Sequence, residues 1–85
     1  MPQNVTRIYP NPAYGFFHVL LTDEDQAFSS LKVYDSNGRV VHKEHLGFAR
    51  VNTINLPGSI TPGVYTVILE SANLASISKK LVILD

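Results

Sequence analysis

Short apolar segments recur along the chain at intervals of about ten residues, and turn-forming residues separate them. The turn signals are the pairs Asn11-Pro12, Asn37-Gly38, Pro57-Gly58 and Pro62-Gly63. No stretch carries the apolar stripe of an amphipathic helix. The pattern therefore predicts seven β-strands, at residues 5–9, 16–22, 30–35, 39–46, 51–56, 64–70 and 77–84.

Two of these strands are apolar on both faces, which is typical of strands in the middle of a sheet. In residues 16–22, Phe17 and Val19 alternate with Phe16 and Leu20, and residues 64–70 show the same pattern. Seven short strands at this spacing favour two packed sheets over a closed barrel. The expected fold class is all-β, a seven-stranded β-sandwich.

The third and fourth strands are expected to form a hairpin, and two registers are available to it. A two-residue loop at Asn37-Gly38 would place Lys32 directly opposite Lys43, a like-charge pair that destabilises a sheet. A type I turn over residues 35–38, with Gly38 in the left-handed conformation, instead sets Asp35 opposite Arg39. It also places Leu31 and Val33 on one face with Val41. We favour this second register, in which Gly38→Ala would strain the turn.

The last strand predicts an edge of the sheet. Lys79 falls on the more apolar face with Leu81 and Ile83, and full burial of its charge would be costly. Its ammonium group must therefore reach solvent at an edge, or a bulge must turn the residue outward. An open edge at residues 77–84 also predicts weak self-association of the chain at high concentration.

Composition limits the function classes further. The chain has 85 residues, no cysteine and a formal net charge of zero. This length suits one small domain without disulfides, and the charge balance gives no basic field for nucleic acid. No apolar run approaches the roughly 20 residues of a membrane span, so membrane insertion is not expected. Residues 1–3 do not begin a signal peptide.

Candidate catalytic and metal-binding residues are sparse. The acidic run Asp23-Glu24-Asp25 is not an EF-hand loop and is expected to be a solvated loop. His42 and His45 are three apart on one strand and point to opposite faces, so they do not form a zinc site with His18. No nucleophile-elbow spacing or carboxylate pair is evident. We expect no cofactor, no metal and no enzymatic activity.

Four motifs in order give the chain a resemblance to a known family. Residues 8–12 (IYPNP) followed by Gly15, residues 31–41 (LKVYDSNGRVV), residues 63–67 (GVYTV) and residues 79–83 (KKLVI) resemble the C-terminal sorting domains of the type IX (Por) secretion system. Each motif alone is weak, but the ordered set spans nearly the whole chain. Tyr14 and Phe16 are bulkier than the residues usual after the first motif.

The resemblance implies a specific role. Members are immunoglobulin-like sandwiches at the C-terminus of larger secreted proteins of Bacteroidota. Their N-terminal cargo domain reaches the periplasm, and the sorting domain is then recognised by the outer-membrane translocon. A surface sortase normally removes it, which here implies cleavage near or before Val5. Residues 1–4 would be a linker or an expression remnant and residues 5–85 the sorting domain, with the cargo secreted or held at the cell surface.

The resemblance assigns partner recognition to residues of three motifs: Pro10, Asn11, Pro12, Asp35, Gly38, Arg39, Lys79, Lys80, Leu81 and Val82. Turn geometry alone also explains the prolines, Asp35 and Gly38. Edge protection also explains the lysines. An alternative function is a non-catalytic glycan-binding or adhesion module. Its candidate sugar-stacking aromatics, Tyr14, Phe16, Phe28, Tyr34 and Phe48, are scattered along the chain.

Overall fold

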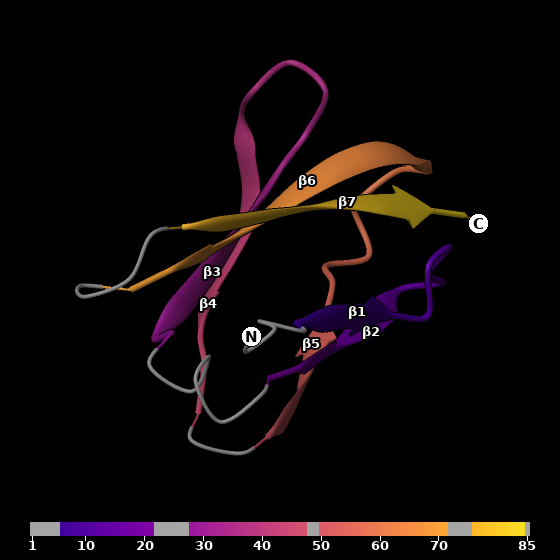
Figure 1. Cartoon of the computed structure of the whole chain (residues 1–85). Coiled ribbons are helices and arrows are strands. Elements are labelled where there is room, and N and C mark those ends of the chain that lie inside the picture. The colour runs from indigo at the N-terminus through magenta and orange to yellow at the C-terminus, as the bar shows by residue number, and fades with distance from the viewer. Residues whose placement is uncertain (1–5, 22–27, 48–49, 72–75, 85) are drawn as a thin grey trace.

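A computed structural model shows a chain built of strands arranged in two antiparallel sheets (Figure 1). It describes residues 6–21, 28–47, 50–71 and 76–84. Within these ranges there are seven strands and no helix. The strands are β1 (Arg7–Tyr9), β2 (Phe16–Leu20), β3 (Ser30–Tyr34), β4 (Val40–His45), β5 (Val51–Asn55), β6 (Gly63–Glu70) and β7 (Ile77–Ile83).

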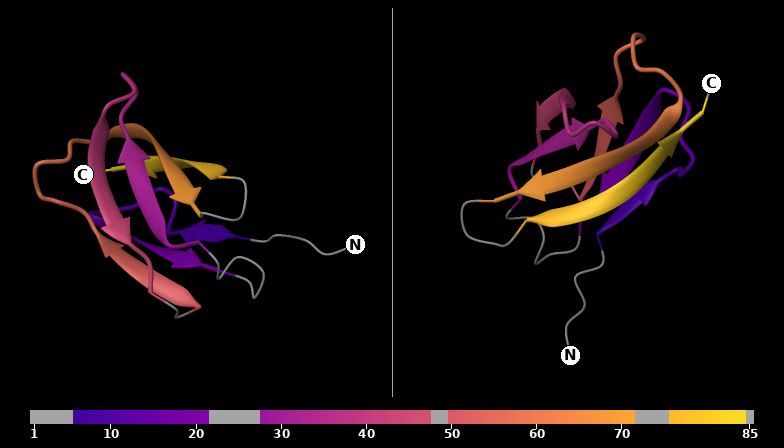
Figure 2. Two further views of the ribbon diagram at one scale, coloured as in Figure 1. Left: turned by 90° about the vertical axis from the view of Figure 1, so that its left-hand side faces the viewer. Right: turned by 90° about the horizontal axis from the view of Figure 1, so that it is seen from above.

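The strands divide into a three-stranded and a four-stranded sheet, seen as two layers in Figure 2. The orders are β1-β2-β5 and β4-β3-β6-β7. All seven predicted strands are confirmed, with ends that differ by one or two residues. Val5 and Thr22, two of the predicted strand ends, lie outside the described residues.

One hydrophobic core contains residues from both sheets, as the alternating pattern predicts. Phe17 and Val19 of β2 are fully buried, and so are Val67 and Leu69 of β6. Both strands lie in the middle of their sheets, which confirms the interpretation of their two apolar faces. Burial of each such side chain stabilises the fold by roughly 1.5–3 kcal/mol relative to its exposed state.

The turn between β3 and β4 has the predicted geometry. The Gly38 amide donates to the Asp35 carbonyl at 3.0 Å, and the Asp35 amide donates to the Arg39 carbonyl at 2.9 Å. Gly38 has a φ of +85°, in the left-handed region that only glycine adopts without strain. The type I turn and the pairing of Asp35 with Arg39 are confirmed. The turn projects beyond the two sheets (Figure 1).

We expect Gly38→Ala to lower the free energy of unfolding by about 1 kcal/mol, because alanine is strained at a positive φ. A Cβ at this position would contact nothing within 4 Å, so the effect isolates backbone conformation. Gly63→Ala is the matched control, since its Cβ would lie 3.7 Å from the Tyr65 ring, an ordinary contact. Urea denaturation compares the two. Equal losses in both variants would contradict the explanation.

The register of the hairpin beyond the turn corrects part of the prediction. Lys32 does lie directly opposite Lys43, the pairing that the favoured register avoids. The pairing shifts between Val33 and Tyr34, so Val41 forms a second bulge that moves the rest of β4 by one residue. Val41 still packs against the core that contains Leu31 and Val33, as predicted.

The Lys32–Lys43 pair is tolerated because Lys32 has a partner on the other neighbouring strand. Its Nζ lies 3.4 Å from a carboxylate oxygen of Glu70 on β6. Both side chains are about one-third exposed, so the ion pair stays accessible to solvent and contributes modestly. The like-charge argument was wrong because it considered one neighbouring strand of β3 and not both.

Lys79 reaches solvent at the edge of the sheet and is not turned outward by a bulge. The pairing of β7 with β6 runs without a shift from Ile83 opposite Gly63 to Ile77 opposite Leu69. Lys79 therefore shares a face with the buried Leu81 and is itself half-buried. Because β7 is an edge strand, the ammonium group of Lys79 can reach solvent past the sheet margin.

Candidate functional site

The first and last motifs meet through the side chain of Asn11. Its Nδ2 donates to the Lys80 carbonyl at 2.9 Å, and its Oδ1 accepts from the Val82 amide at 2.9 Å. One side-chain amide thus pairs with the edge of β7 in the way that a neighbouring strand would. The two residues flanking Asn11 are Pro10 and Pro12, both exposed and both preceded by a cis peptide bond.

The backbone continues this pairing one step along β7. The Ala13 amide donates to the Val82 carbonyl and the Leu84 amide donates to the Ala13 carbonyl, each at 2.8 Å. Ala13 is fully buried, and beside it Leu81 and Ile83 point into the core. Residues 10–13 therefore cover the β7 edge from Lys80 to Leu84. The predicted open edge at residues 77–84 is narrower than expected, and its exposed part lies around Ser78.

The second candidate group is the turn at residues 35–39. Asp35 Oδ1 accepts from the amides of Asn37 and Arg39, each at 2.9 Å, and Oδ2 lies 3.3 Å from Arg39 Nε. These donors, the Arg39 amide above all, lower the pKa of Asp35 from its ordinary value of 3.8, against an opposing effect of desolvation. The Arg39 side chain is 77% exposed and remains accessible to a partner.

Acidification is expected to weaken this turn. The folded-state pKa of Asp35 lies below its ordinary value, so the carboxylate contributes stability above pH 3.8, and this is lost as pH falls through the folded-state pKa. Asp35→Asn keeps an acceptor oxygen and removes the titration. The urea midpoint is measured at neutral pH and at about pH 3. Its decrease between these two pH values should be larger in the parent protein than in the variant. An equal fall would contradict the assignment.

Strand register brings the motif regions to the same end of the four-stranded sheet. Gly63 lies opposite Ile83, and Tyr34, the last residue before the turn, lies opposite Thr66. The Tyr65 hydroxyl donates to the Thr61 carbonyl, which fixes the entry into β6. A cavity of about 480 Å³ separates the turn at residues 35–39 from residues 59–65.

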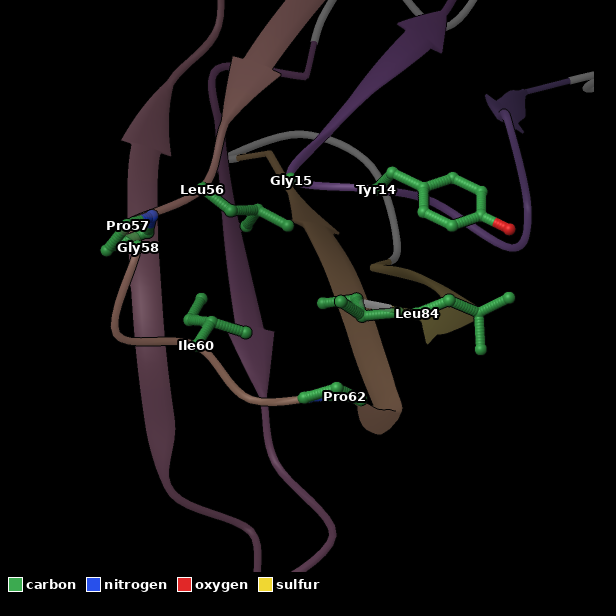
Figure 3. Close-up of a pocket in the computed structure, with 9 residues that line it drawn as sticks. Tyr14, Gly15, Leu56, Pro57, Gly58, Ile60, Pro62 and Leu84 are labelled. Atoms are coloured by element: carbon green, nitrogen blue, oxygen red, sulfur yellow. The ribbon is translucent and has the colours of Figure 1, made fainter.

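A smaller and more apolar cavity lies beside the C-terminal end of β7. It has a volume of about 260 Å³ (Figure 3). Leu56, Ile60 and Pro62 lie on one side of it, and Tyr14 and Leu84 on the other. Gly15, with a φ of +90°, turns the chain beside the cavity, and its carbonyl accepts from the Leu56 amide. Sequence reasoning noted Gly15 within the first motif but did not predict this contact.

The described residues contain no group of three or more potential metal ligands. His42 and Glu44 form a pair at 3.0 Å, and the acidic run at residues 23–25 lies outside the described residues. The described candidate sugar-stacking aromatics do not all lie on one exposed face. Phe28 is buried, Tyr34 is on a different sheet from Phe16, and Phe48 lies outside the described residues. The described residues include no helix long and apolar enough to span a membrane.

A comparison with protein families agrees with the resemblance carried by the four sequence motifs. Residues 7–84 match the family described as the secretion system C-terminal sorting domain. This chain belongs to that family. No individual curated protein matches it. The sorting domain is thus a C-terminal signal of type IX secretion, carried by a larger cargo protein that the secretion system exports from the cell. Domains of this family are not normally catalytic.

The structure gives roles in the sorting domain to three residues that were not among those assigned to partner recognition. Ala13 extends the Asn11 contact, Tyr65 holds the entry to β6, and Gly15 turns the chain into β2. The match begins at the first residue of β1 and ends one residue after β7, so it covers all seven strands.

Proposed function

We propose that this sorting domain directs its cargo through the outer-membrane translocon of the type IX system to the cell surface, and that a surface sortase then removes it. The single observation that supports this most is the pairing of Asn11 with Lys80 and Val82. Two sorting motifs about seventy residues apart form one structural unit, which a translocon can recognise only when the domain is folded.

We propose an immunoglobulin-like sandwich as the fold. The strand orders β1-β2-β5 and β4-β3-β6-β7 are those of an A-B-E and C′-C-F-G arrangement. The Tyr65 hydroxyl, bonded to the carbonyl four residues upstream at the start of β6, matches the tyrosine corner found before strand F in such domains.

The recognition surface proposed here includes the exposed members of the three motifs. Pro10, Pro12 and Lys80 are exposed around the β7 edge, and Arg39 is exposed on the turn at residues 35–39. Leu81 is fully buried and supports this surface from below. Gly38 and Asp35 shape the turn that carries Arg39, and Val82 binds Asn11 through its amide.

An export assay tests the proposal. The domain is fused to the C-terminus of a periplasmically targeted fluorescent protein in a host with the type IX machinery, and surface and medium fluorescence are measured. Deleting residues 79–85 would remove Leu81 and Ile83 from the core, so loss of export would not separate recognition from unfolding. Arg39→Gln and Lys80→Gln alter exposed side chains only, and Lys43→Gln on the opposite sheet edge is their control.

The expected result is export of the intact fusion and of Lys43→Gln, with reduced export for Arg39→Gln or Lys80→Gln. If a folded, intact fusion stays in the periplasm, the sorting role is wrong for this chain. The mass of the exported product locates the sortase cut, which we place near or before Val5, with residues 1–4 as linker.

Weak homodimer formation through β7 stays a prediction. Residues 10–13 occupy the edge from Lys80 to Leu84, so among the described residues of β7 the stretch around Ser78 is left for a second copy. Antiparallel pairing of two such stretches would bring the lysines of both copies together, and like charges oppose each other across strands. We therefore expect dimers only at high protein concentration. Sedimentation velocity over a concentration series measures this, and a monomer at every concentration would contradict it.

A further inference from the structure

A groove lies between the edges of the two sheets, next to the contact of Asn11 with β7. Its volume is about 570 Å³, and it runs between β1 and β7, which lie side by side in Figure 2. Its described lining combines three cations with polar and apolar side chains. The lining residues are Thr6, Arg7, Ile8, Tyr9, Asn11, Leu20, Lys79 and Lys80.

The described lining of the groove is basic. Arg7, Lys79 and Lys80 all line it, and its described lining includes no carboxylate. None of the three forms an ion pair with a carboxylate of the described residues, whereas Lys32 and Arg39 each have one. In a chain whose formal net charge is zero, this is a local concentration of positive charge. Such a concentration attracts an anionic ligand.

Next to the groove, β7 also has backbone groups that pair with no other described residue. In an antiparallel ladder, alternate residues direct both backbone groups toward the same neighbour. The Lys80 carbonyl and the Val82 amide point outward to Asn11, so Ser78, two residues earlier, points outward as well. Residues 10–13 pair with β7 from the Lys80 carbonyl onward, which leaves the backbone of Ser78 and the Lys80 amide for another strand.

We propose that this groove binds an extended acidic peptide segment of a partner protein. The peptide backbone pairs with Ser78 and the Lys80 amide by strand addition, and its carboxylates lie beside Arg7, Lys79 and Lys80. A second copy of the domain is a poor ligand for this groove, since the lysines on its β7 would lie against Lys79 and Lys80 of the first copy. The strand edge favours a peptide over a polyanionic glycan, because the N–H and C=O groups of a peptide backbone have the same spacing as those of β7.

The identity of the partner rests on the proposed function: if the domain is a type IX sorting signal, the acidic segment belongs to the type IX machinery. The peptide site itself can be measured without that machinery. Binding and export are therefore tested separately.

The binding test uses a short fluorescein-labelled peptide with adjacent glutamates at its centre, which an extended strand directs to both faces, and valines on either side. Its matched control has glutamine in place of each glutamate. Anisotropy gives the affinities at low and high salt, and amide shifts in NMR spectra locate the site. We expect binding of the glutamate peptide only, weaker at high salt, with the largest shifts at Ser78 and Lys80.

Variants separate charge from backbone pairing. Arg7→Gln, Lys79→Gln and Lys80→Gln should each weaken binding about two- to fivefold, as expected for exposed ion pairs, and Lys43→Gln should leave it unchanged. Ser78→Pro removes the outward amide, which an edge strand tolerates, and should abolish strand addition. Circular dichroism checks that each variant folds. If a variant does not fold, the amide shifts in the NMR spectra of the parent protein still test the site.

Several outcomes would overturn the inference: equal binding of both peptides, shifts confined to β4, or binding of a heparin fragment with no binding of the peptide. Failure of the groove variants to bind peptide while their fusions are exported normally would separate the groove from sorting. Peptide binding by a domain whose intact fusion is not exported would leave the groove standing and overturn the proposed function.

Discussion

Leu81→Ala is expected to lower the free energy of unfolding by about 2–5 kcal/mol, the range for a fully buried leucine truncated to alanine. Leu81 is 0% exposed, and its strand lies at the edge of the sheet, where residues 10–13 must pack against it. The cavity left by the substitution would loosen β7 on its core-facing side. Small domains are marginally stable, so this loss is a large part of the total.

Urea denaturation of the isolated domain measures the effect, with Val82→Ala as the control. Val82 is the next residue on the same strand but points away from the core and is half-buried. We expect it to lose less than about 1.5 kcal/mol, since less apolar area leaves the interior. Equal losses for the two variants would show that β7 is not packed as described.

The second large effect concerns Asn11. Asn11→Ala removes both side-chain hydrogen bonds to β7, and at about 1 kcal/mol each the expected loss is about 2 kcal/mol. The backbone bonds of Ala13 remain and limit the damage. The amide of Val82 should lose protection from hydrogen exchange, because its acceptor is the Asn11 side chain.

Two further variants sharpen this test. Asn11→Asp keeps the acceptor for the Val82 amide but places a carboxylate oxygen against the Lys80 carbonyl, so it should be at least as destabilising near neutral pH. Asn55→Ala is the control, because Asn55 is exposed on β5 and has no side-chain hydrogen bond to another described residue. A stability of Asn11→Ala equal to that of the control would mean that the pairing with β7 is not formed in solution.

The strands of this fold could be predicted from sequence, because local patterns encode them. Alternation placed Phe17 and Val67 in the core, and the aspartate and glycine of the turn predicted its type correctly. The bulge at Val41 could not be predicted, since it depends on how β4 meets the core. Nor could the ion pair of Lys32 with Glu70, which joins β3 to a strand that is not its hairpin partner.

The candidate site was predictable as a set of motifs but not as a geometry. The contact of Asn11 with Lys80 and Val82 joins residues 69 and 71 positions apart, and no periodic pattern reports such a pairing. The meeting of Arg7 with Lys79 in the groove was missed for the same reason. They lie on edges of different sheets, and only the tertiary structure brings those edges together.

The contact between Asn11 and β7 also affects when the folded domain can form during synthesis. Its two halves are made at the beginning and the end of the domain, so a ribosome that stops early releases a chain without Val82. Such a chain has the Asn11 loop and no strand for it to bind. If export requires this pairing, as the proposed function implies, cargo truncated before Val82 lacks the signal and is excluded from export without a separate proofreading step.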